Sequence, residues 1–142
     1  MHNIVLYFNT TLTNLMCLKI AILANNLIDH MKFTSRKLNL FIAFKLPAAY
    51  FTGVRTKSID AQKCVVAVKH RWINQNPFKS MFWAVQGMAA ELSTGALIMV
   101  KIQDSNKKIS MLVTENKARF TKKAKGVITF TCDQGHLVDE AL

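Results

Sequence analysis

The chain has 142 residues, of which 51% are apolar, and its formal net charge is +11. This length fits one domain with a single core, and the apolar content excludes intrinsic disorder. No run approaches the roughly 18 consecutive apolar residues that span a bilayer, so we expect a soluble protein.

Residues 1–33 differ in character from the rest and are predicted to be an N-terminal extension that is not part of the fold. Thr and Asn interrupt their apolar runs, and Lys19 and Asp29 are the only charges before Met31. The segment lacks the basic start and the small-residue cleavage site of a secretory signal. Two interpretations stay open: an ordered extra helix over Leu15–Ile28, or an upstream extension in front of a start at Met31.

The first element of the fold is a short helix that Ser35 caps and Pro47 perturbs or ends. Two strands follow, Val54–Ile59 and Cys64–Trp72, because both are rich in β-branched or apolar residues and the second alternates. Residues 60–62 are predicted to form the turn between them.

A long helix and two more strands complete the predicted plan. Apolar side chains recur at three-four spacing and predict a helix over Phe78–Ile102. The later strands are Ile109–Phe120 and Gly126–Cys132, joined by the loop Thr121–Lys125. Strands on both sides of one long helix indicate an α+β domain in which an antiparallel sheet wraps that helix.

Glu91 is the strongest candidate for chemistry, because it is one carboxylate in an otherwise apolar helical pattern. Its neighbours along the helix strip are small, namely Ala84, Gly87, Thr94 and Gly95, so a ligand can approach closely. Removal from bulk water makes a carboxylate a stronger base, able to activate water or to attack an activated carbonyl. The alternative is a glutamate at the helix rim, solvated or paired with a lysine.

The positive charge belongs to Met31–Leu142, which contains 18 bases and 7 acids. Such a surface favours nucleic acid, anionic lipid, acidic carrier proteins or phosphorylated cofactors. The lysines of residues 121–125 predict a cationic rim for phosphate groups, with a solvated loop as the alternative. Phe120 and Phe130 alternate with polar residues in the manner of sheet residues, which disfavours nucleic-acid binding.

The cysteines and histidines indicate neither a metal site nor a cofactor. Cys17, Cys64 and Cys132 are odd in number, far apart and outside any metal-ligand spacing. They are typical of thiols in a reducing compartment, so a cytoplasmic location is expected. The four histidines do not cluster in the sequence either.

This plan resembles the hotdog-fold thioesterase superfamily over about residues 35–139, in particular its phenylacetyl-CoA-thioesterase-like branch and a related group of domains of unknown function. In that branch an Asn is followed six positions later by His-Gly-Gly, and the catalytic Asp or Glu comes nine positions after the His. Asn76 and Glu91 keep both intervals, with Phe82, Trp83 and Ala84 in place of His-Gly-Gly. The related group has a similar Asn-Pro-Phe-x-Ser-Met…Ala-Ala-Glu-Leu stretch.

The resemblance implies hydrolysis of an acyl-CoA or acyl-carrier thioester, with Glu91 as base or nucleophile and Asn76 organising the start of the helix. It also implies a homodimer or dimer of dimers with sheets joined edge to edge, and a further C-terminal strand, so that the domain at residues 34–142 is expected to be incomplete. The expected substrate-binding residues are Ser80, Phe82, Trp83, Ala84, Gly87, Lys122, Lys123 and Lys125.

Two alternatives to catalysis stay open. The first is a non-catalytic acyl-CoA or fatty-acyl binding module of the same fold, which keeps the binding tunnel without the chemistry. The second is a basic adaptor for an acidic carrier protein or nucleic acid. Turnover of acyl-CoA separates the enzyme from both alternatives.

Overall fold

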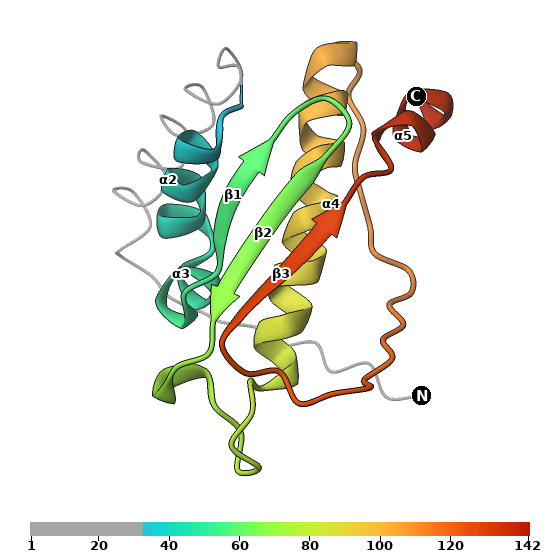
Figure 1. Ribbon diagram of the computed structural model, residues 1–142. Coiled ribbons are helices and arrows are strands. Elements are labelled where there is room, and N and C mark those ends of the chain that lie inside the picture. Colours follow the sequence, from blue (N-terminus) through green and yellow to red (C-terminus); the bar gives the residue numbers. More distant parts are fainter. Residues whose placement is uncertain (1–32) are drawn as a thin grey trace, which may run out of the picture. The chain divides into compact units, whose positions relative to one another are not determined.

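The centre of the fold is a three-stranded antiparallel sheet with the strand order β1-β2-β3 (Figure 1). The structure is a computed structural model that describes residues 33–142. β1 spans Arg55–Ile59, β2 spans Cys64–Lys69 and β3 spans Val127–Cys132. Strands are therefore confirmed at these three predicted places. β2 ends earlier than expected, because Trp72–Asn74 form the short 3-10 helix η1 instead.

The pairing of the strands is defined by the turn between β1 and β2 and by the register of β2 against β3. Between β1 and β2 the Asp60 carboxylate accepts hydrogen bonds from the N–H groups of Gln62 and Lys63 at 2.8 and 2.9 Å, which confirms the predicted turn. β2 and β3 pair without interruption, from Cys64 opposite Cys132 to Lys69 opposite Val127.

The two outer edges of the sheet differ. Helix α2 (Ser35–Lys45) brings Asn39 to the outer edge of β1. There the Asn39 amide donates to the carbonyl of Thr56 at 2.9 Å and accepts from its N–H at 2.8 Å, as a neighbouring strand would. Among the described residues β3 has no strand on its other side. The free edge of the sheet is therefore the β3 edge.

Two short helices precede the sheet. Thr34, rather than Ser35, is the N-cap of α2, and its hydroxyl accepts from the N–H of Lys37 at 3.4 Å. Pro47 is the first residue of helix α3 (Pro47–Thr52), where its missing N–H costs nothing. Gly53 ends α3 with a φ of +89°, a conformation that favours glycine.

The long helix α4 spans Trp83–Ser105 and lies across one face of the sheet (Figure 1). It begins later than the predicted Phe78, because residues 76–81 form a tight turn that precedes it. A last short helix, α5 (Gly135–Ala141), follows β3 and contacts α4. None of the helices among residues 33–142 is long and apolar enough to cross a membrane.

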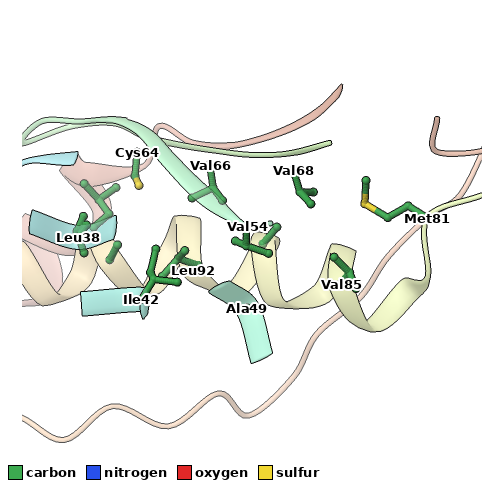
Figure 2. Close-up of a cluster of buried hydrophobic side chains, with 13 residues drawn as sticks. Leu38, Ile42, Ala49, Val54, Cys64, Val66, Val68, Met81, Val85 and Leu92 are labelled. Atoms are coloured by element: carbon green, nitrogen blue, oxygen red, sulfur yellow. The ribbon is translucent and has the colours of Figure 1, made fainter. Parts of the chain in front are cut away.

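The core fills the space between α2, the sheet and α4 (Figure 2). α2 contributes Leu38 and Ile42, and the inner side of β2 contributes every second residue, as the strand period requires. α4 adds one face at three-four spacing. Each large side chain buried here stabilises the fold by about 1.5–3 kcal/mol. The fully buried side chains include Leu38, Ile42, Val54, Cys64, Val66, Val68, Met81 and Leu97.

The predicted strand Ile109–Phe120 is wrong. These residues have no regular secondary structure and are exposed. They pass along the side of α4 that faces away from the sheet, since Met111 lies near Gly95 and the ring of Phe120 contacts Trp83. β propensity makes a strand only where a partner strand pairs with it, and no described strand lies beside this segment. The three strands and the central helix remain an α+β arrangement consistent with a hotdog fold.

Candidate functional site

The turn before α4 is built around Asn76. Its side-chain oxygen accepts hydrogen bonds from the N–H of Phe78 at 3.0 Å and from the N–H of Ser80 at 3.2 Å. Its side-chain amide also donates to the Ser80 hydroxyl at 3.1 Å. Lys79 takes a φ of +57°, which lets the chain reverse tightly. Asn76 therefore holds the turn that precedes the helix, while Ser80 is buried and already hydrogen-bonded.

The first turn of α4 offers unoccupied backbone donors. Its N-cap is Phe82, whose side chain cannot accept a hydrogen bond, and no other side chain caps the helix there. The N–H groups of Val85 and Gln86 donate back to the carbonyl of Phe82, so the first two N–H groups, of Trp83 and Ala84, are the donors that remain. The positive end of a helix dipole favours an oxyanion or a phosphate at this position.

The lysine-rich loop at residues 121–125 lies against this turn, although it is about 40 residues away in the sequence. The N–H of Met81 donates to the carbonyl of Ala124 at 2.9 Å, and Lys123 reaches the carbonyl of Phe78 at 3.5 Å. One turn further along, Trp83 and Phe120 meet edge to face with ring centroids 4.9 Å apart. The structure therefore joins two sets of predicted substrate-binding residues at the N-terminal end of α4.

The lysines of this end of the molecule have no acidic partner. Lys79, Lys122, Lys123 and Lys125 are all exposed. The two salt bridges of the described residues join Lys101 with Asp139 and Lys117 with Glu115, so neither involves these four lysines. The sequence has no acid between Ala61 and Ala90 either. Four exposed and unpaired ammonium groups make a cationic rim that suits a polyanion such as a nucleotide phosphate.

Glu91 lies on α4 about two turns beyond the rim, which is roughly 12 Å along the helix axis at 1.5 Å per residue. It is exposed, on the side of the helix away from the sheet, and no other described residue makes a hydrogen bond or ion pair with it. The strip of small residues around it is also accessible: Ala84 and Thr94 are exposed, and Gly87 and Gly95 are partly so. Among residues 33–142, nothing covers the Glu91 carboxylate.

Apolar side chains border the two glycines on the strip around Glu91. A Cβ placed on Gly87 would meet Trp83 at 3.8 Å, and one placed on Gly95 would meet the end of Met111 at 3.6 Å. The two glycines are thus bordered by a tryptophan and a methionine, which suits a flat or flexible apolar group better than a polar one. Among residues 33–142, no group of three or more His, Cys, Asp or Glu side chains is close enough to hold a metal ion.

Some residues that organise the site are not apparent from their sequence context. Asn74 is buried, and its side chain donates to the carbonyls of Thr52 and Lys69 at 2.9 Å and accepts from the N–H of Arg71 at 2.8 Å. It joins α3, β2 and the loop that leads to α4. A polar residue between Ile73 and Gln75 gives no sign of burial, because neither a strand nor a helix pattern includes it.

Comparison with known proteins gives a family without an assigned activity. The family described as "Domain of unknown function (DUF4442)" matches residues 35–138. No curated protein matches the sequence. A crystal structure of a protein with unknown function from Chlorobaculum tepidum TLS is similar, with a TM-score of 0.61 and 24% identity over 70% of this chain, which supports the fold alone. The chain spans 60% of that protein's length. Because the family match covers most of the chain, the protein belongs to the DUF4442 family of domains of unknown function.

Proposed function

We propose that this protein acts on an acyl thioester, with the cationic rim holding the phosphates of coenzyme A or of a carrier and Glu91 acting on the thioester. The observation that carries the proposal is the contact between the loop at residues 121–125 and the start of α4, made by the hydrogen bond from Met81 to Ala124. The proposed phosphate-binding surface then lies at the N-terminal end of α4. Glu91, the only acid in the first half of that helix, lies further along it. The resemblance to the hotdog thioesterases supports the same roles.

In the proposed reaction, three sets of groups of this chain have roles. The lysines Lys122, Lys123 and Lys125 bind the anionic end of the substrate. The N–H groups of Trp83 and Ala84, at the end of α4 beside the rim, donate to an anionic oxygen of the substrate. Glu91 takes a proton from a water molecule whose oxygen bonds to the carbonyl carbon, or its own carboxylate forms that bond and water then cleaves the resulting anhydride. In both routes the C–S bond breaks and the thiolate leaves.

Because Glu91 is exposed, the proposed site needs further surfaces that exclude water from it. A carboxylate in bulk water is well solvated, and hydrolysis gains from a drier surrounding. A second copy of the chain, joined at the free β3 edge as the resemblance suggests, would supply further walls. Because the two described cysteines are free thiols, we place this assembly in a reducing compartment such as the cytoplasm.

A second candidate function is binding of an acyl-CoA or fatty acyl group without turnover. It is favoured by the contact between Trp83 and Phe120 at the N-terminal end of α4. The hydrolases of the resembled branch have glycines at the start of this helix. A large ring at the first helical position narrows access to the backbone donors of that turn. This module would keep the rim and the apolar border and lack the hydrolytic step.

The test of catalysis is thioester hydrolysis by the Glu91→Gln variant over a panel of acyl-CoAs. Glutamine preserves shape and removes the basic oxygen, so the rate is expected to fall at least ~10²-fold with folding intact. Asp104→Asn, which removes an exposed acid from the same helix, is the matched control and should leave the rate unchanged. Equal turnover by wild type and Glu91→Gln would dismiss the mechanism. Acyl-CoA binding without turnover in either would establish the second candidate.

The test of the cationic rim is the triple variant Lys122→Ala, Lys123→Ala, Lys125→Ala. Its dissociation constant for acyl-CoA should rise by about tenfold or more and lose much of its salt dependence, while binding of an acyl-pantetheine that lacks the nucleotide stays unchanged. The matched control removes the same charge from exposed lysines away from the rim, Lys57, Lys63 and Lys108. If both triple variants weaken binding equally, the effect is net charge and the loop is not the site.

A further inference from the structure

Two thiols lie directly opposite each other on neighbouring strands. Cys64 begins β2 and Cys132 ends β3, and the two are register partners. Both cysteines are free. Both belong to the side of the sheet that packs on the core, where Cys64 is fully buried and Cys132 is partly exposed (Figure 2 shows Cys64). One oxidant-accessible thiol thus lies beside one protected thiol.

The separation of the two residues suits a disulfide. The N–H of His70 donates to the carbonyl of Gly126 at 2.7 Å, which marks this register pair as hydrogen-bonded. Such pairs alternate along an antiparallel ladder, so the pair Cys64 and Cys132, six residues before His70 in the sequence, is of the same kind. Its Cα atoms are then about 5.5 Å apart, within the roughly 4.4–6.8 Å that disulfides span, and its Cβ atoms, about 5 Å apart, must approach by roughly 1 Å for the bond to form.

The two thiols differ in reactivity. Burial raises the pKa of Cys64 to about 11, with smaller contributions from the nearby Cys132 and Asp60. A thiol that is buried and protonated is a poor first target for an oxidant. Cys132 is the more accessible sulfur and is therefore oxidised first, with Cys64 positioned to react with the product.

We propose that Cys132 and Cys64 form a peroxide-sensitive dithiol, in which Cys132 is oxidised and Cys64 resolves it to a cross-strand disulfide. The Cys132 sulfur attacks hydrogen peroxide, the O–O bond breaks, and a sulfenic acid and water result. The Cys64 sulfur then attacks the sulfenic sulfur, forms the S–S bond and releases a second water. The two cysteines lose two electrons and two protons, and the peroxide accepts them. This site is independent of the proposed thioester chemistry.

The disulfide would fasten β3 to β2 at the end of the sheet next to α5. Since α4 and the loop at residues 121–125 lie between the two cysteines in the sequence, the bond would also close a loop that contains the whole candidate site. Cross-links of this kind restrict the unfolded chain and stabilise the folded one. Oxidation would thus stabilise the folded unit that carries the candidate site.

The test uses the full chain with Cys17→Ser, which removes the third thiol. After treatment with hydrogen peroxide, we expect the loss of two titratable thiols per chain, a mass decrease of two hydrogens, and a peptide that joins Cys64 to Cys132 and separates on reduction with dithiothreitol. In the Cys64→Ser variant Cys132 should stay as a sulfenic acid that dimedone captures. Over-oxidised Cys132 with Cys64 still reduced in the otherwise intact chain, or a disulfide between chains, would overturn the proposal.

A matched control moves the thiol by one residue. In Cys132→Ser with Thr131→Cys, the new thiol lies on the opposite face of the sheet, because successive side chains of a strand alternate. Peroxide should leave Cys64 reduced in this variant, which retains the same number of thiols. Formation of an equally rapid disulfide with Cys64 would show that the sheet opens, and that the native register does not direct the reaction.

Discussion

At the scale of single residues, short amide side chains connect the elements around the candidate site. Asn39 pairs with the backbone of β1, Asn74 joins α3 to β2, and Asn76 forms the turn before α4. An asparagine side chain carries both a donor and an acceptor, so one residue satisfies backbone groups that would otherwise be buried unpaired. Glu91 contrasts with all three, because its carboxylate makes no hydrogen bond or ion pair with any residue of the part of the chain that the structure describes.

The buried Asn74 should be the most sensitive of these residues. Replacing it with alanine leaves the carbonyls of Thr52 and Lys69 without their donor, and each unsatisfied buried group costs about 1–3 kcal/mol. We expect Asn74→Ala to lower the free energy of unfolding by at least ~2 kcal/mol in urea denaturation. Gln75→Ala, at the exposed neighbouring position, is the control and should change it by less than about 0.5 kcal/mol. A loss of equal size in both variants would contradict the role of Asn74.

At the scale of elements, hydrophobic periodicity predicts the parts that pack on the core. The three strands and α4 follow from it, because alternating and three-four patterns report burial directly. It fails where burial is absent. The segment Ile109–Phe120 is rich in strand-forming residues but is exposed, and the start of α4 is set by hydrogen bonds of Asn76 that an apolar count does not contain.

Sequence patterns reveal the separate parts of the candidate site, but not the contacts that bring these parts together. The intervals from Asn76 to Glu91 single out a hydrogen-bonded turn and a residue of the helix that follows it, while the roles of both residues stay predictions. The cationic loop is visible as a run of lysines. That the loop lies against the turn depends on one long-range backbone hydrogen bond, from Met81 to Ala124, for which neither segment has a sequence signal. The exposure of Glu91 likewise depends on which side of α4 the sheet covers.

One ion pair joins α5 to α4, and its contribution to stability should depend on pH. The buried ammonium group of Lys101 lies 2.6 Å from the Asp139 carboxylate, which Gln62 also contacts at 3.3 Å. The hydrogen bond from Lys101 is the main cause that lowers the pKa of Asp139 below its usual 3.8, and Gln62 and the charges of Lys101 and His136 act in the same direction. A lowered pKa in the folded state means that the unfolded state binds the proton more readily.

The contribution of Asp139 to stability is therefore fully present above pH 3.8 and is lost as the pH falls through the lower value of the folded state. We expect Asp139→Asn to be less stable than wild type at pH 7, and the difference in melting temperature to shrink below about pH 4. Glu140→Gln removes a neighbouring exposed carboxylate that has no ion pair and should show no such pH-dependent difference. A difference for Asp139→Asn that is constant from pH 7 to pH 3 would argue that the ion pair does not hold α5.

At the scale of the whole molecule, the fold and the excess of charge belong to the same part of the chain. Residues Phe33–Leu142 form one compact unit, and the family match begins at residue 35. The predicted helix Leu15–Ile28 and the rest of residues 1–32 lie outside the described residues. The bases that make the cationic rim, the free β3 edge and the cysteine pair all lie in the compact unit. Folding and binding are therefore expected of this part by itself.

Deletion of Met1–His30 should accordingly leave the melting temperature nearly unchanged. The deletion retains Thr34, the N-cap of α2, and every residue of the core of the described unit. The control is deletion of Met1–Leu38, which removes that cap and a fully buried leucine and should cost about 2–5 kcal/mol of stability. If instead the shorter deletion already costs several kcal/mol, at about 1.5–3 kcal/mol for each large apolar side chain that it exposes, then the extension packs on the domain and belongs to its core.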